Sequence, residues 1–230
     1  MESSLLNNKE LEWSAVVANN AMNRERVAIG INSYEKDIKL NPIQHIEEKG
    51  SQSEIRWLDL CCGRGNALIQ VYKHFEASHI ADRLFLEGID LVDYFADHPL
   101  SEKLSLRKLN LSDWQPTIKY DLITSVHGIH YLGDKFEVIT KSMNALKDDG
   151  LFVANLDLDN IKIEGQKNSK PLLSEYFKEN NMAYNSRTKI LKAAFSSDIT
   201  SRFIYQGADD KAGPNYTGQA AVNSVYSLND

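Results

Sequence analysis

Residues 55–68 have the sequence Ile55-Arg56-Trp57-Leu58-Asp59-Leu60-Cys61-Cys62-Gly63-Arg64-Gly65-Asn66-Ala67-Leu68, and this stretch decides the fold. An apolar run that ends in an acid, followed by small residues, two glycines and helix formers, predicts a buried strand that turns tightly into a helix. The glycines let a ligand approach the backbone, and the helix presents unpaired N–H groups toward it. We therefore predict a nucleotide-like ligand at this turn, and Asp59 favours a cationic ligand over a pyrophosphate.

Length and composition bound the class of protein. The 230 residues suffice for one sizeable α/β domain, and 42% hydrophobic with 25% charged residues is ordinary for a soluble globular chain. A net charge of -6, with no run of Lys or Arg longer than a pair, argues against nucleic acid as a partner. The adjacent Cys61 and Cys62 exclude a disulfide framework and favour a reducing compartment. The sequence has neither a signal peptide nor a membrane-spanning stretch, so we expect a cytoplasmic protein that binds no membrane.

Residues 1–50 are expected to form an N-terminal helical cap. Apolar residues at positions 13, 16, 17 and 21 recur at helix-face spacing, which predicts a first helix. This helix is either a solvated amphipathic helix or a lid over the ligand. A second helix is expected to begin after Asn32-Ser33 and to end at Ile38, and a third to begin at Asn41-Pro42 and to end at Gly50.

Residues 51–230 are expected to form one structural unit in which strands alternate with helices. We expect helices at 67–75, 135–146 and 171–180, and strands at 55–60, 83–89, 104–109, 120–126 and 151–156. This alternation predicts an α/β fold with a doubly wound, mostly parallel seven-stranded sheet. Near the end of the chain, strands 188–195 and 199–205 are expected to pair as an antiparallel hairpin, followed by strand 221–228. Residues 196–230 then form the C-terminal hairpin and loop.

The second strand ends in Glu87-Gly88-Ile89-Asp90. Asp90 follows the glycine turn at slightly more than the usual spacing for an acid that binds ribose hydroxyls. The alternative is that Asp90 caps a helix that begins near Asp93, because strand-to-helix turns favour Asp. Both interpretations place the carboxylate at the end of a strand.

Two further segments are candidates for the substrate side. The fourth strand is followed by His127-Gly128-Ile129-His130-Tyr131, at the edge where parallel sheets bind ligands. Each histidine is either structural or acts on the substrate. The loop 207–219 is rich in Gly, Pro and Asn. It is either a long surface turn or a wall of the substrate site, with Tyr216 inside.

Four segments stand at successive strand ends: Asp59-Leu60-Cys61-Cys62-Gly63-Arg64-Gly65, Gly88-Ile89-Asp90, Asn110-Leu111 and Tyr120-Asp121-Leu122-Ile123-Thr124-Ser125-Val126-His127. Together they resemble the motifs of the class I, Rossmann-like, S-adenosylmethionine-dependent methyltransferase family. The resemblance covers about residues 55–160, and motif order over four strands is far more specific than a lone glycine motif. Cys61 stands where the family often has glycine, and Asn110 where it often has Asp. Cysteine is also small, and an asparagine oxygen still accepts from an adenine amine.

The resemblance implies S-adenosylmethionine as the cofactor, S-adenosylhomocysteine as the product, and no metal. It implies that the glycine turn packs under the methionine part and that Asp59 orients nearby donors and the ammonium group. Asp90 would accept from the ribose hydroxyls, and Asn110 with Leu111 would border the adenine. The expected cofactor-binding residues are Asp59, Cys61, Gly63, Gly65, Asp90, Leu91, Asn110, Leu111 and Ser125.

A sulfonium is an activated methyl donor, so catalysis needs mainly alignment of the acceptor and removal of its proton. Position favours His127, and next His130, as the base or orienting group. We hypothesise that Arg24 or Arg26 binds an acceptor carboxylate bidentately. The expected acceptor-binding residues are Asn20, Asn23, Arg24, Arg26, Tyr34, Tyr131 and Tyr216.

The expected acceptor is a small molecule or a natural-product peptide, methylated on oxygen or nitrogen, bound by a monomer or homodimer. An NAD-dependent oxidoreductase is the first alternative, disfavoured because the turn lacks the third glycine of the dinucleotide motif and carries Asp59. A non-catalytic S-adenosylmethionine-binding regulator is the second. Nucleic-acid methylation is least expected, because the fourth motif lacks an Asn/Asp-Pro-Pro-aromatic sequence.

Overall fold

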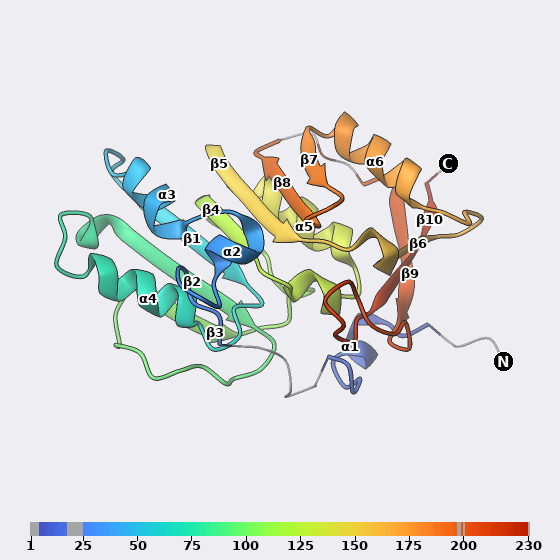
Figure 1. Ribbon diagram of the computed structural model, residues 1–230, viewed down its shortest axis with the longest axis horizontal. Coiled ribbons are helices and arrows are strands. Elements are labelled where there is room, and N and C mark those ends of the chain that lie inside the picture. Colours follow the sequence, from blue (N-terminus) through green and yellow to red (C-terminus); the bar gives the residue numbers. More distant parts are fainter. Residues whose placement is uncertain (1–4, 18–24, 197–198, 200, 230) are drawn as a thin grey trace.

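The computed structural model describes residues 5–17, 25–196, 199 and 201–229. Its main sheet has seven strands in the order β3-β2-β1-β4-β5-β8-β7 (Figure 1). The first five pair in parallel, whereas β8 is antiparallel to both β5 and β7. This confirms the predicted seven-stranded, mostly parallel sheet. The strands are β1 Ile55–Leu60, β2 Leu84–Asp90, β3 Leu104–Lys108, β4 Tyr120–Ser125, β5 Leu146–Asn155, β7 Met182–Asn185 and β8 Ile190–Ala194.

Helices cover both faces of the sheet, as a doubly wound fold requires. Side chains alternate along β1, so Ile55 and Trp57 belong to one core and Leu58 and Leu60 to another. The first core contains α2 Tyr34–Ile38, α3 Pro42–Glu48 and α4 Asn66–Phe75. The second contains α5 Lys135–Asn144 and α6 Lys170–Glu179. Three short 3-10 turns complete the helical elements: η1 Ala81–Arg83, η2 Gly128–Tyr131 and η3 Leu158–Asn160.

The predicted hairpin of strands 188–195 and 199–205 is wrong. The first of these, β8, pairs with β7 and β5, and the second belongs to a separate three-stranded sheet. That sheet consists of β6 Ile161–Ile163, β10 Asn223–Leu228 and β9 Phe203–Asp209. The reason is aromatic packing: Phe203 stacks on Phe136 of α5 at 4.6 Å between ring centroids, and Tyr226 lies 5.0 Å from Phe136. Burying these rings directs β9 and β10 away from the main sheet.

The first predicted helix of the cap is also wrong in extent. The helix α1 covers only Asn8–Leu11, and a capping box between Asn7 and Glu10 caps its N-terminus. Trp13 lies beyond it and is 86% exposed, so the apolar residues from position 13 onward form no helix face where they are described. Position 21 lies outside the described residues. The second and third helices, α2 and α3, are confirmed.

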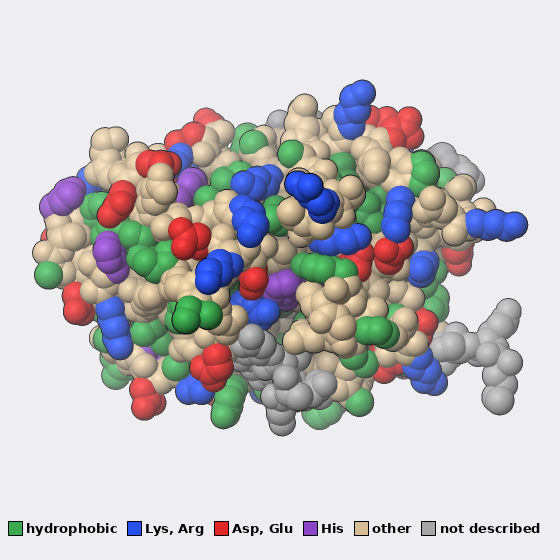
Figure 2. All heavy atoms as spheres, viewed as in Figure 1, with side chains coloured by type: hydrophobic (Ala, Val, Ile, Leu, Met, Phe, Trp, Pro, Cys, Tyr) green, Lys and Arg blue, Asp and Glu red, His purple; other side chains and the backbone are tan. Residues whose placement is uncertain are grey.

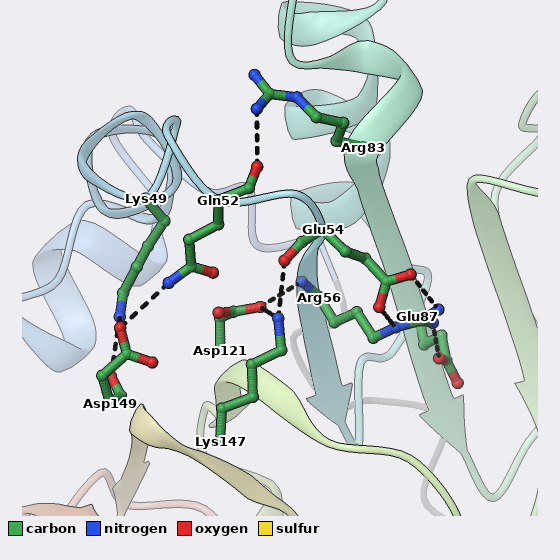
Figure 3. A network of polar contacts seen from close by, with 9 residues as sticks. All are labelled: Lys49, Gln52, Glu54, Arg56, Arg83, Glu87, Asp121, Lys147 and Asp149. Carbon is green, nitrogen blue, oxygen red and sulfur yellow. Dashed lines mark hydrogen bonds and ion pairs between the residues drawn. The ribbon is translucent and has the colours of Figure 1, made fainter.

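A network of charged side chains ties the amino ends of three strands together (Figure 3). Asp121 is the second residue of β4. Its carboxylate accepts hydrogen bonds from the backbone N–H of Arg56 in β1 and from Nζ of Lys147 in β5, both at 2.7 Å. Lys147 also donates to the Glu54 carbonyl at 2.7 Å. These contacts occupy the edge of the sheet opposite to the carboxyl ends of the strands. None of the helices in the described part of the chain combines the length and apolar character needed to cross a bilayer.

Candidate active site

A pocket of about 1110 Å³, open solvent included, lies at the carboxyl ends of β1 to β4. This is the edge where open α/β sheets bind ligands. Ten of the residues predicted from the sequence line it: Arg26, Tyr34, Cys61, Gly63, Asp90, Leu91, Asn110, Leu111, His127 and Tyr131. Gly65, Asp59, Ser125, His130 and Tyr216 are not among its lining residues. Asn20, Asn23 and Arg24 lie outside the described residues.

The turn after β1 has the backbone that its glycines predict. Gly63 and Gly65 have φ values of 59° and 76°, in the left-handed region. Cys61 also has a positive φ, 58°, which costs a non-glycine residue roughly 1–2 kcal/mol. Gly128 allows the loop after β4 to approach this turn, because a Cβ there would lie 2.3 Å from the Cβ of Cys61. The two loops therefore meet so closely that position 128 has no room for a side chain.

Asp90 lies at the pocket wall and fastens the turn. Its carboxylate accepts hydrogen bonds from the Gly63 N–H at 2.8 Å and from the Val92 N–H at 3.1 Å. No helix follows within the described residues 91–103, so the alternative of a cap for a helix near Asp93 is wrong. The segment between Asp90 and β3 has neither helix nor strand, and Asp90 lines the pocket.

Asp59 lies beneath the pocket and not in its wall. It is fully buried and accepts hydrogen bonds from the Tyr34 hydroxyl and from the Thr124 hydroxyl, both at 2.6 Å. Trp57 Nε1 in turn donates to Thr124 Oγ1 at 2.8 Å. Burial raises the pKa of Asp59 to about 7, although both hydrogen bonds lower it. The group that faces the pocket above Asp59 is therefore the phenol of Tyr34.

Asn110 contacts a residue that the sequence did not indicate. Its side-chain oxygen accepts from the Ser112 N–H at 2.9 Å, and its Nδ2 donates to the carboxylate of Glu12. Glu12 follows α1 and lines the pocket together with Asn8, Leu11 and Val17. The N-terminal segment thus forms one wall of the site, which no motif around Glu12 predicts.

His127 faces the pocket and contacts a carboxylate from the cap. Its Nε2 lies 3.4 Å from Asp37 Oδ2, and Arg26 Nε donates to the same oxygen at 2.6 Å. Burial raises the pKa of Asp37, but the hydrogen bonds from His127 and Arg26 outweigh it and leave this pKa below its ordinary value. Asp37 was not predicted, because an acid on a short polar helix has no distinguishing pattern.

His130 lies behind His127 and is fully buried. Burial, together with His127 and Lys135, lowers the pKa of His130 to about 3, so this ring is neutral near pH 7. Such a ring is too weakly basic to share the role of His127. The structure therefore favours the structural interpretation of His130.

The loop 207–219 borders the site through one residue. Gln219 lines the pocket and accepts a hydrogen bond from the Tyr131 hydroxyl at 3.1 Å. Tyr216 is 41% exposed, and its ring lies 6.1 Å from that of His127 and 5.6 Å from that of His130. The loop is therefore a wall at Gln219, while Tyr216 packs beside the histidines. Among the residues that the structure describes, no group of three His, Cys, Asp or Glu side chains is arranged to hold a metal ion.

Fold and site together define a Rossmann-like domain with a cofactor pocket at its strand ends. A family profile described as "Methyltransferase domain" matches residues 34–188. The chain therefore belongs to this family of methyltransferase domains, which confirms the family predicted from the sequence. No curated protein matches the chain.

Solved structures with a similar fold are distant. A methyltransferase from Clostridium acetobutylicum is 24% identical at a TM-score of 0.36, over 49% of this chain and 48% of that one. The plantazolicin methyltransferase BpumL, solved with S-adenosylhomocysteine, is 16% identical at a TM-score of 0.40, and the match covers 55% of this chain and 52% of BpumL. A methyltransferase from Thiobacillus denitrificans, also solved with S-adenosylhomocysteine, is 14% identical at a TM-score of 0.35, and the match covers 48% of this chain and 47% of that one. The aligned part is thus about half of each solved chain.

Proposed function

We propose that this chain is an S-adenosylmethionine-dependent methyltransferase that acts on an oxygen or nitrogen atom of a small molecule or natural-product peptide. The observation that carries the proposal is the meeting of the glycine turn, Asp90 and His127 in one pocket. Asp90 binds the ribose side of a nucleoside, and His127 lies on the acceptor side. A methyl-transfer site needs both a part that binds the cofactor and a part that binds the acceptor.

The residues present fit the cofactor. Gly63 has no Cβ, so a ligand can approach the backbone closely at its left-handed turn. Asp90 presents a carboxylate that can accept from ribose hydroxyls while its backbone partners hold it in place. Leu91 and Leu111 add apolar surface against which the adenine of the cofactor can pack. S-adenosylmethionine supplies a sulfonium-activated methyl group when it is bound there.

The chain's own residues then have two tasks. The pocket walls would align the acceptor atom with the methyl group that the bound cofactor supplies. His127 takes the proton that the acceptor atom loses. Its place in the pocket wall and its contact with Asp37 support this role.

The acceptor class rests on the segments that enclose the pocket. Arg26 and Tyr34 from the cap, and Gln219 from the C-terminal loop, lie around His127 and Tyr131, which suits a compact acceptor. Acidic and basic side chains are interspersed on the face drawn in Figure 2, and the net charge is -6, so we do not propose nucleic acid as the acceptor.

Calorimetry with S-adenosylmethionine and with NADH separates this proposal from the oxidoreductase. We expect binding of the first ligand only, and binding of NADH alone would overturn the proposal. Formation of S-adenosylhomocysteine in cell extract separates the enzyme from a regulator. Tight binding without any turnover across extracts would leave the regulator as the better description.

A further inference from the structure

The side chain of Asn110, which follows β3, is held at both ends of its amide. Its oxygen accepts from the Ser112 N–H at 2.9 Å, and its Nδ2 donates to Oε1 of Glu12. Glu12, Asn110 and Ser112 all line the pocket. The amide oxygen is thus already engaged by the backbone, and the polar group beside it is the carboxylate of Glu12.

Glu12 brings a hydrogen-bond acceptor to this part of the pocket. Its side chain comes from the N-terminal segment and is only partly buried. A carboxylate has about four lone-pair sites on its two oxygens, so one bond from Asn110 leaves it able to accept others. A carboxylate does not donate. This part of the pocket therefore suits a ligand that presents an N–H or O–H group.

The pocket wall near Glu12 is otherwise apolar. Leu11 and Val17, from the same segment, are buried in one cluster against which Leu91 packs, and Leu111 is buried beside Asn110. All four apolar side chains line the pocket. A flat aromatic base with a donor on its edge fits such a wall, because its faces contact apolar surface while its edge meets the carboxylate.

Asp90 and Asn110 lie at neighbouring strand ends. Asp90 of β2 is paired with Lys108 of β3, and the Leu109 N–H donates to the Asp90 carbonyl at 2.9 Å. Asn110, the next residue, holds the carboxylate of Glu12. The carboxylate proposed for the ribose and the carboxylate of Glu12 are therefore neighbours, as the joined sugar and base of one nucleoside require.

We propose that the Glu12 carboxylate recognises the adenine of the cofactor by accepting a hydrogen bond from its exocyclic amine, and that Asn110 positions this carboxylate. Hypoxanthine carries an oxo group in place of the amine, so it would present an acceptor to an acceptor. Glu12 lies outside the residues 34–188 that match the family profile, so the N-terminal segment of this chain supplies the recognition. The inference rests on the proposed function for the identity of the ligand.

Calorimetry of the intact protein with S-adenosylhomocysteine and with S-inosylhomocysteine, its hypoxanthine analogue, tests the proposal. We expect the wild type to prefer the adenine ligand by roughly tenfold to 100-fold, the range for a hydrogen bond to a charged group. Glu12→Gln keeps an oxygen for Asn110 and gains an amide N–H for the oxo group. We expect this variant to bind the adenine ligand more weakly and the hypoxanthine ligand at least as tightly as the wild type does. Its binding of the hypoxanthine ligand also shows that the variant is folded.

Asp113→Asn is the matched control. It removes an exposed acid that lies three residues after Asn110 and is not among the residues that line the pocket. We expect it to keep the preference of the wild type. The competing acceptor is the Asn110 oxygen itself. If Asn110→Ala abolishes the preference for adenine while Glu12→Gln retains it, the amine is bound by Asn110 and the proposal is overturned.

The same titrations separate this inference from the proposed function. A wild type that binds S-adenosylhomocysteine, with an equal preference for adenine in Glu12→Gln, would overturn the inference alone. A wild type that binds neither ligand would overturn the proposed function and the inference with it. Binding is the readout in each case, so no acceptor is needed.

Discussion

The Tyr34 hydroxyl donates a 2.6 Å hydrogen bond to the buried carboxylate of Asp59 and so ties α2 of the cap to the end of β1. Removing the hydroxyl in Tyr34→Phe leaves one carboxylate oxygen without its donor. We expect the free energy of unfolding to fall by about 1–3 kcal/mol, measured by urea denaturation. Tyr94→Phe removes an exposed hydroxyl and should change the stability little. Equal effects of the two substitutions would show that the contact with Asp59 contributes nothing.

The raised pKa of Asp59, about 7, makes stability depend on pH. The folded protein keeps this proton to higher pH than the unfolded chain, so unfolding releases it between about pH 4 and pH 7. Raising the pH through this window therefore favours unfolding. We expect the wild type to lose stability relative to Asp59→Asn as the pH rises from about 4 to about 7. Urea denaturation of both proteins across this range measures the difference, and a constant difference would refute the assignment.

In the proposed function, the carboxylate of Asp90 accepts hydrogen bonds from the ribose of the cofactor. Hydrogen bonds to a charged group are worth about 1.5–3 kcal/mol, so Asp90→Asn should weaken binding of S-adenosylhomocysteine by roughly tenfold to 100-fold. Isothermal calorimetry measures this directly. Asp93→Asn changes a nearby exposed acid and should bind like the wild type. If both variants bind normally, the ribose contact lies elsewhere in the pocket.

Gly128 has no room for a side chain beside Cys61. A methyl group at position 128 would lie 2.3 Å from the Cβ of Cys61, so we expect Gly128→Ala to reduce stability by about 1–3 kcal/mol. Cys61→Gly removes that Cβ and also relieves the positive φ of residue 61. Thermal unfolding should therefore show that the double variant recovers much of the loss. Additive losses in the double variant would locate the clash at another neighbour, such as Ser125.

The sequence by itself determined the sheet and the family. The apolar run, acid and glycines of residues 55–68 are local features, and the strand and helix periods that follow are repeated signals. Asp90, His127 and the glycine turn could be placed together because parallel strands end at one edge of a sheet. The partners of β8 and β9 could not be predicted, because the burial of Phe203 and Tyr226 against Phe136 depends on residues far apart in the chain.

Only the tertiary structure decided what surrounds that edge. Asp37 reaches His127 across 90 positions, and Glu12 reaches Asn110 across 98. Both acids stand in short polar segments without a periodic signal. Asp59 has the position in the chain that the sequence predicted, but alternation along β1 directs its side chain to the face beneath α2, where Tyr34 and Thr124 bind it. Local pattern determines the strands of this protein, whereas the contacts that complete its site come from chain segments that only the folded packing brings together.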